Sequence, residues 1–208
     1  MSTIQGSLLD LDPSMRLRPL ADGLTRTKLT EGAWVDHRPG WLGGSQELFD
    51  ELATAVPWHA EERQMWDNWV KVPRLTKFYA ADEALPHPLL VEARESLSDH
   101  YGAELGERFA TAGLCLYRDG RDSVAWHGDR IGRSRHTDTM IAILSVGSAR
   151  TLALRPRAGG RSLGFSLGHG DLVVMGGSCQ RTWDHAIPKT SGHVGPRISI
   201  QFRVRGVR

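Results

Sequence analysis

Cysteine is scarce in this chain of 208 residues, which holds only Cys115 and Cys179. Two cysteines provide no disulfide framework, and such low usage suits a reducing compartment. Long hydrophobic runs are missing too: no apolar stretch approaches the length of a membrane span, and the start of the chain lacks the basic-then-apolar pattern of a secretion signal. These absences argue against a disulfide-stapled secreted module and against contact with a membrane, so we expect a cytoplasmic monomer.

Acidic residues are scarce in one half of the chain only. The net charge is +2, but residues 1–117 carry 11 Lys/Arg against 18 Asp/Glu, whereas residues 118–208 carry 15 against 6. Fourteen of those 15 basic residues are arginines, which are suited to bidentate contact with carboxylates and phosphates. The basic half is therefore either an ordinary solvated surface or a surface for an anionic ligand or nucleic acid.

Helical periodicity is confined to the first half of the chain. Residues 1–30 are polar and irregular, which predicts an N-terminal arm that can be flexible. Apolar residues at helical spacing predict a helix over residues 44–58, capped by Ser45, and a second helix over residues 88–102, ending at Gly102.

From about residue 110 the period changes to that of strands. Short β-branched or aromatic runs alternate with Gly, Asp and Pro turns at roughly ten-residue spacing, the pattern of an antiparallel sandwich, jelly roll or barrel. The chain length fits a single structural domain, so we expect an α+β fold with helices first and an all-β core after them. The expected strands lie within residues 111–120, 122–129, 138–147, 149–160, 162–171, 171–177, 181–188 and 197–205.

Three side chains form a candidate metal site. In "VAWHGDRIG", His127 and Asp129 are two positions apart and therefore point to the same face of a strand. His185, in "RTWDHAIP", belongs to another short strand. Two histidines and a carboxylate on neighbouring strands make a facial triad that suits Fe(II), although zinc also accepts these ligands. We interpret the remaining histidines as surface or structural residues: His37, His59, His87, His100, His136, His169 and His193.

Two arginines indicate the second ligand. In "GPRISIQFRVR", Arg197 and Arg203 are six positions apart in a strand-like run and share a face. Guanidinium groups aimed into a cavity are costly unless they meet anions. An iron site beside inward arginines therefore favours 2-oxoglutarate, a keto acid with a second carboxylate at its far end.

The order "LYRDG…WHGD…GHGDLVVMGG…RTWDHAIPK…GPRISIQFR" resembles the AlkB family of Fe(II)- and 2-oxoglutarate-dependent dioxygenases, over roughly residues 70–205. The resemblance implies a double-stranded β-helix (jelly roll) core in residues 110–208, and N-terminal helices with a nucleotide-recognition lid in residues 31–109. It also implies repair of alkylated DNA, and possible action on RNA. Fe(II), 2-oxoglutarate and O2 would remove the methyl group of 1-methyladenine or 3-methylcytosine and release formaldehyde, succinate and CO2. The base must be single-stranded or flipped out to reach the iron.

The resemblance also assigns roles to residues. His127, Asp129 and His185 would bind iron, and these three together with Arg203 form the implied catalytic group. Arg203 would lie near the keto-acid end of the cosubstrate and the oxygen site. The implied cosubstrate-binding residues are Tyr117, Cys115, Arg197, Ser199 and Arg203, with Arg197 at the far carboxylate. The implied substrate-binding residues are Trp69, Arg74, Tyr79, Arg130 and Arg161.

Two departures from the family pattern concern the ligands. Cys115 stands two residues before Tyr117, where the family has asparagine, so the cosubstrate loses a hydrogen-bond partner there. The segment after Asp129 is basic, with Arg130, Arg133 and Arg135, where some family members carry acidic residues. That change favours a phosphate backbone nearby and leaves the identity of the damaged base open.

Several alternatives remain open. The same fold can act on tRNA bases, a protein or a small metabolite. A non-catalytic nucleic-acid-binding domain leaves the triad unexplained, and a zinc hydrolase leaves the inward arginines unexplained. We interpret Asp171 as a turn residue rather than a fourth ligand. Cys179 is expected to pack in the core, and Trp126 and Trp183 to build the wall of the barrel.

Overall fold

The computed structural model describes residues 14–65, 68–129, 132, 134 and 136–207. Its helices are α1 (Ser45–Ala55), α2 (Pro88–Leu105), the short α3 (Cys179–Thr182) and the 3-10 turn η1 (Thr30–Gly32). In the part of the chain so described, no helix has the length and apolar character needed to cross a membrane. The strands are β1 (Arg16–Leu17), β2 (Thr25–Lys28), β3 (Ala33–Arg38), β4 (Leu42–Gly43), β5 (His59–Met65), β6 (Asn68–Tyr79), β7 (Phe109–Tyr117), β8 (Val124–His127), β9 (Ile141–Gly147), β10 (Arg150–Pro156), β11 (Leu163–Leu167), β12 (Asp171–Gly177), β13 (Trp183–Ile187) and β14 (Arg197–Val204).

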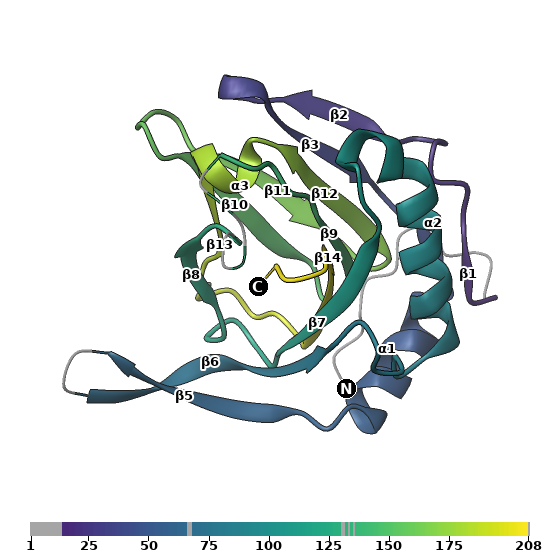
Figure 1. Cartoon of the computed structure of the whole chain (residues 1–208). Coiled ribbons are helices and arrows are strands. Elements are labelled where there is room, and N and C mark those ends of the chain that lie inside the picture. The colour runs from purple at the N-terminus through teal and green to yellow at the C-terminus, as the bar shows by residue number, and fades with distance from the viewer. Residues whose placement is uncertain (1–13, 66–67, 130–131, 133, 135, 208) are drawn as a thin grey trace.

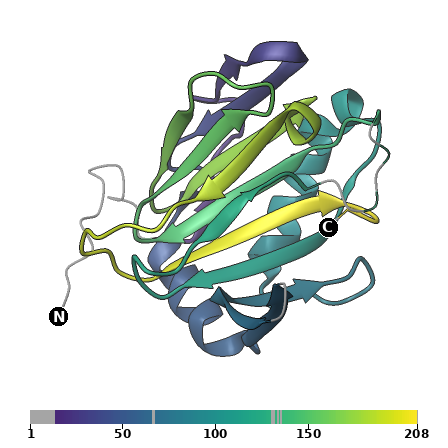
Figure 2. The ribbon, with the colours of Figure 1, turned by 90° about the vertical axis from the view of Figure 1, so that its left-hand side faces the viewer.

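Two antiparallel sheets form the jelly roll. The large sheet has the order β2-β3-β12-β9-β14-β7-β6-β5, and the small sheet has the order β11-β10-β13-β8. The small sheet lies across from the middle of the large one, while α1 and α2 cover the other face of the large sheet (Figure 1). Strand β14, yellow in Figure 2, runs between β7 and β9 at the centre of the large sheet. The expected jelly-roll architecture is confirmed.

All eight runs expected to be strands after residue 110 are strands, β7 to β14. Strands are not confined to that half, however, because β2, β3, β5 and β6 belong to the same large sheet. The interpretation of residues 1–30 as irregular is wrong for β1, which pairs with β4, and for β2, which pairs with β3 over four residues. These segments are held by pairing with distant strands, such as β3 with β12 and β6 with β7, and local sequence does not encode those partners.

Both long helices occupy segments expected to be helical, but their ends differ from the prediction. The N-cap of α1 is Gly44 rather than Ser45, and it has a left-handed φ of 62°. A side chain at Gly44 would come within 2.6 Å of the backbone nitrogen of Met15, so this turn requires glycine. Helix α2 passes through Gly102 and ends at Gly106, whose φ of 77° closes it in the usual left-handed manner.

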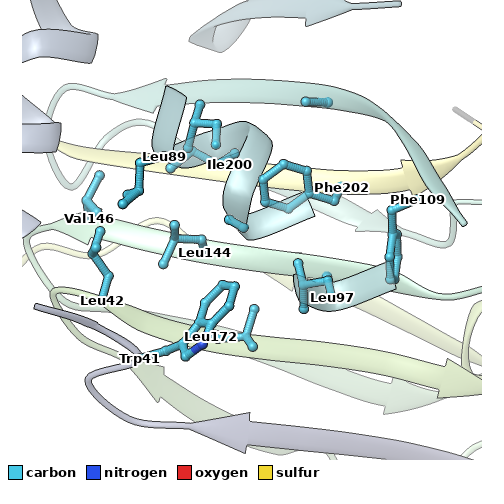
Figure 3. Packing of buried hydrophobic residues seen from close by; sticks show 14 of the residues in the cluster. Trp41, Leu42, Leu89, Leu97, Phe109, Leu144, Val146, Leu172, Ile200 and Phe202 are labelled. Carbon is cyan, nitrogen blue, oxygen red and sulfur yellow. The ribbon is translucent and has the colours of Figure 1, made fainter. Parts of the chain in front are cut away.

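The pleat of β14 divides the interior into two regions. Ile198, Ile200 and Phe202 point toward the helices, where they join Leu144 and Leu97 in the larger apolar cluster (Figure 3). The alternate residues of β14 point toward the small sheet, where a second cluster lines a polar space. The helices therefore anchor one face of the large sheet and leave its other face for a binding site.

The core predicts a clear stability effect for Leu144→Ala. Leu144 is fully buried in the helix-facing cluster, so this truncation should lower the free energy of unfolding by about 2–5 kcal/mol. Urea denaturation measures it. Val91→Ala is the control, because Val91 is 40% exposed and should change stability by less than about 0.5 kcal/mol. Equal effects of the two changes would contradict this account of the core.

Candidate functional site

A cavity of about 1030 Å³ lies between the two sheets. Its walls come from the small sheet, from the inner face of the large sheet and from the β5–β6 ribbon, which extends past the rest of the sheet in Figure 1. Within the described residues, the cavity brings together all three expected metal ligands and all five expected cosubstrate residues. Sequence segments up to 88 positions apart, from Cys115 to Arg203, thus meet at one site.

The three candidate ligands face one another. His127 and His185 are direct cross-strand partners in β8 and β13, and their ring centroids are 4.2 Å apart. The Nε2 atom of His127 lies 3.7 Å from Oδ1 of Asp129. One ligand atom from each of the three residues falls within 4.8 Å of the others, a spacing that a single metal ion can bridge.

Both imidazoles present a ring nitrogen to the candidate metal site. The Nδ1 atom of His127 lies 2.8 Å from the carbonyl oxygen of Ala125, so Nδ1 is the donor of this hydrogen bond and Nε2 is the ring nitrogen that faces Asp129. His185 is 6% exposed, and burial lowers its pKa to about 4 against the opposing charge of Asp129. A neutral ring leaves a nitrogen free to bind a metal.

Asp129 uses one oxygen to anchor itself and leaves the other for a metal. Burial raises its pKa, but the positive charge of Arg203 and the hydrogen bonds that Arg203 donates outweigh burial, and the pKa is lowered to about 2. The Nη2 and Nε atoms of Arg203 donate to Oδ2 at 3.0 and 3.3 Å. The backbone N–H of Asp129 donates to Oε1 of Gln180 at 3.0 Å, which fixes the turn after β8. This two-nitrogen, one-oxygen set fits Fe(II) and leaves coordination positions open.

The opposite end of the cavity carries a buried positive charge. Arg197 is 1% exposed, and its Nε donates to Oγ of Ser145 at 2.8 Å. Its Nη1 is buried without a hydrogen-bond partner among the described residues, and burial lowers the pKa of the guanidinium. Tyr117 lies beside it, with its ring centroid 5.4 Å from the guanidinium carbon. A buried guanidinium with no carboxylate partner in the described part of the chain and one unpaired nitrogen favours an anion beside it, so a carboxylate fits at this end.

Gln201 is a cavity residue that the sequence reasoning missed. It lies between Ser199 and Arg203 on the inner face of β14, and it donates to Ser199 and accepts from Arg203. The strand alternation that places Arg197 and Ser199 on the inner face places Gln201 there as well. Gly113, directly opposite in β7, leaves the necessary room, because a side chain there would come within 2.8 Å of Nη1 of Arg203.

Of the three expected substrate-binding residues whose side chains the structure describes, one lies in the cavity wall. Arg74 lines the cavity and donates to the carbonyl oxygen of Ser123 at 3.2 Å. Tyr79 is 5% exposed in the cluster beneath the helices, so its assignment to substrate contact is wrong. Arg161 is exposed in the β10–β11 loop and is absent from the cavity lining. Arg130, Arg133, Arg135 and the side chain of Trp69 lie outside the described residues.

The remaining interpretations are mostly confirmed. Asp171 accepts from the backbone N–H groups of Gly40 and Gly168, both at 2.7 Å, and is a turn carboxylate. Cys179 and Trp183 are buried in the cavity-side cluster. Trp126 lines the cavity from β8, the edge strand of the small sheet, and is 37% exposed, so it forms part of the barrel wall at an open edge. Of the other histidines, His59 also reaches the rim of the cavity.

The geometry predicts that His185→Ala loses metal. Removal of one of three ligands should weaken Mn(II) or Fe(II) binding by more than about 100-fold, since changes outside the ligand shell alone cost on the order of 10- to 100-fold. Anaerobic calorimetry measures this affinity. His193→Ala is the matched control, because His193 is exposed on a loop. Full metal affinity in His185→Ala would exclude the triad.

Known proteins resemble this chain in sequence. A model of the 2OG-Fe(II) oxygenase superfamily matches residues 44–203. "Alpha-ketoglutarate-dependent dioxygenase alkB homolog 3" of Bos taurus is 30% identical over 205 residues, which is 87% of this chain and 66% of the relative. The human protein of that name is 29% identical over 175 residues, 75% of this chain and 60% of the relative. Human "DNA oxidative demethylase ALKBH2" is 26% identical over 179 residues, with coverages of 76% and 68%.

The family model covers the whole candidate site, whereas this chain covers only part of the length of each relative. This chain spans less than two thirds of the length of the bovine and human alkB homolog 3 proteins. The matched region nevertheless contains every candidate metal ligand and the three arginines that line the cavity, Arg74, Arg197 and Arg203. The chain therefore belongs to the 2OG-Fe(II) oxygenase superfamily and, by these relatives, to its AlkB family.

Proposed function

We propose that this chain is an Fe(II)- and 2-oxoglutarate-dependent dioxygenase that demethylates alkylated nucleobases, such as 1-methyladenine or 3-methylcytosine, in DNA and also in RNA. One observation carries the proposal: a two-histidine, one-carboxylate site shares a single cavity with a buried guanidinium, that of Arg197, whose Nη1 has no partner among the described residues. The names of the relatives, a dioxygenase and a DNA oxidative demethylase, favour the same chemistry.

In this proposal His127, Asp129 and His185 hold Fe(II). Iron held there would supply oxidative chemistry, with O2 as the oxidant, 2-oxoglutarate converted to succinate and CO2, and the methyl group released as formaldehyde. The protein contributes position and charge. Arg197 holds the far carboxylate of 2-oxoglutarate, and Arg203 keeps Asp129 ionised and oriented.

The cavity walls suit an oxidative step on a base. Ile143, Leu152 and Ile187 line the space with apolar surface, which limits water around the metal. The base has to leave its stack to enter, and we propose that the β5–β6 ribbon, residues 59–79, is the lid that receives it. Arg74 on β6 is the described lid residue whose guanidinium lies in the cavity wall, with its Nε buried and unpaired among the described residues.

A surface beside the metal site suits the flanking nucleotides. The guanidinium carbon of Arg155 lies 4.5 Å from the ring centroid of Trp126, which is exposed and borders the cavity. Next to it is a hollow of about 310 Å³ whose lining includes Arg155, Arg157 and Asp184. Two guanidinium groups share this one carboxylate, at 3.5 and 2.7 Å, which leaves an excess positive charge. An aromatic ring next to excess positive charge is typical of surfaces for single strands.

The first prediction of this proposal concerns activity. A single-stranded DNA oligonucleotide with 1-methyladenine or 3-methylcytosine should lose its methyl group when incubated with the protein, Fe(II), 2-oxoglutarate and O2. Mass spectrometry of the oligonucleotide detects the loss, and His127→Ala should abolish it. If the oligonucleotide stays methylated while succinate still forms, the substrate is instead a tRNA base, a protein or a small metabolite. If no succinate forms, the dioxygenase proposal itself is overturned.

The second prediction concerns the Trp126–Arg155 surface. Trp126→Ala should weaken binding of a single-stranded oligonucleotide by about 1–3 kcal/mol, the usual contribution of one stacked base. Arg155→Gln should lower the slope of log affinity against log salt concentration by about 0.7, the value for one phosphate contact with a single strand. Fluorescence anisotropy measures both effects.

Arg108→Gln is the matched control for that surface. Arg108 is also exposed and also paired with carboxylates, Glu95 and Asp99, but it lies at the end of α2. Its substitution should leave both affinity and salt slope unchanged. The surface is excluded if Arg155→Gln and Arg108→Gln behave alike.

A further inference from the structure

Gln201 occupies the floor of the cavity between the two buried arginines. Arg197, Ser199, Gln201 and Arg203 alternate along the inner face of β14. Among the described residues that line the cavity, Gln201 carries the single carboxamide. Any acid that reaches from the metal triad to Arg197 must pass over this part of the strand.

The hydrogen bonds of Gln201 fix the orientation of its amide. Arg203 donates to Oε1 through Nη2, and a guanidinium has no acceptor. The oxygen of the carboxamide therefore faces Arg203, and the NH2 group faces the middle of the cavity floor. This NH2 group donates to Oγ of Ser199 at 3.2 Å and to Sγ of Cys115 at 3.6 Å.

One of these two donated bonds is weak. The sulfur of a thiol is a poor acceptor, so the N–H of Gln201 that points to Cys115 gains little from it. A carboxylate oxygen is a far better partner, because bonds to charged acceptors are stronger and shorter. The N–H group of Gln201 can therefore exchange the sulfur of Cys115 for an anionic ligand as its hydrogen-bond acceptor at small cost. The oxygen of the carboxamide keeps its bond to Arg203.

We propose that Gln201 is a cosubstrate-binding residue, which donates from Nε2 to a carboxylate oxygen of 2-oxoglutarate. The inference rests on the proposed function. It also accounts for Cys115 at the position where the family resemblance expects asparagine. Ser199 pairs with Cys115 across β14 and β7, and Gln201 is the next inward residue on β14. The carboxamide that β7 lacks is supplied by the neighbouring strand.

A purely structural role for Gln201 has a different signature. A residue that only supported Arg203 would alter Asp129 and hence metal affinity, but it would leave the affinity for 2-oxoglutarate unchanged once the metal is saturating. A cosubstrate-binding residue changes the dissociation constant for 2-oxoglutarate under those same conditions. The two affinities must therefore be measured separately.

The experiment uses anaerobic calorimetry on the full chain, first with Mn(II) and then with 2-oxoglutarate at saturating Mn(II). Gln201→Met keeps the length of the side chain and removes the amide, so it should weaken 2-oxoglutarate by about 10- to 100-fold, the effect of losing one hydrogen bond to a charged group. Gln201→Glu should weaken it further, because a carboxylate then faces a carboxylate. Gln46→Met, on the exposed face of α1, should change nothing. Thermal unfolding of each variant verifies that it is folded.

A second pair of variants tests the relation to Cys115. In a Cys115→Asn background a carboxamide is restored on β7, so Gln201→Met should cost much less affinity than it does in the natural chain. An equal cost in both backgrounds contradicts the replacement of asparagine by Gln201. If the natural chain binds 2-oxoglutarate and Gln201→Met binds it equally well, this inference is overturned while the proposed function stands. If the natural chain binds no 2-oxoglutarate, the proposed function itself fails.

Discussion

The site depends on the pleat of one strand, β14. Successive side chains of a strand point to opposite faces, so eight residues serve two purposes at once. Ile198, Ile200 and Phe202 are fully buried against the helices and hold the strand at the centre of the large sheet. Arg197 and Arg203 are thereby fixed at the two ends of the cavity floor. A slip of one residue in pairing would exchange the two faces, so the apolar face determines where the charges lie.

Among three buried arginines, Arg203 and Arg150 have their charge offset or solvated by the protein, whereas Arg197 is left incomplete. Arg203 is offset by Asp129, whose ionised form it stabilises in return. Arg150 is buried at 4% exposure and donates to the carbonyl oxygens of Asp119, Asp122 and Pro188, which satisfies its guanidinium with neutral groups. Arg197 differs from both, because one of its nitrogens is buried with no protein partner in the described part of the chain. The protein therefore satisfies the hydrogen bonds of Arg150 by itself and leaves the Nη1 atom of Arg197 for a ligand to pair with.

Sequence patterns predicted those features that depend on period and spacing. The eight strands after residue 110 and the meeting of His127, Asp129 and His185 follow from alternation and from the order of the segments. What could not be predicted depends on partners far away in the chain. Strand β2 exists because β3 pairs with it, and Tyr79 is buried because α2 and the large sheet enclose it. Gln201 was missed as well, although strand alternation places it on the inner face of β14. The reason is that a glutamine does not by itself indicate a binding role until its neighbours in the fold are known.

The strongly basic composition of the C-terminal half has a different meaning once partners are assigned. Most of its described arginines are committed inside the protein or to adjacent carboxylates, such as Arg118 to Asp122 and Arg181 to Asp138. Charge counted along a sequence therefore overstates the charge offered to a polyanion, since a paired guanidinium contributes little field at the surface. Recognition of a substrate must depend on the few arginines that share a carboxylate or line the cavity. For that reason geometry beside the metal site, rather than net charge, decides where a nucleic acid strand can bind.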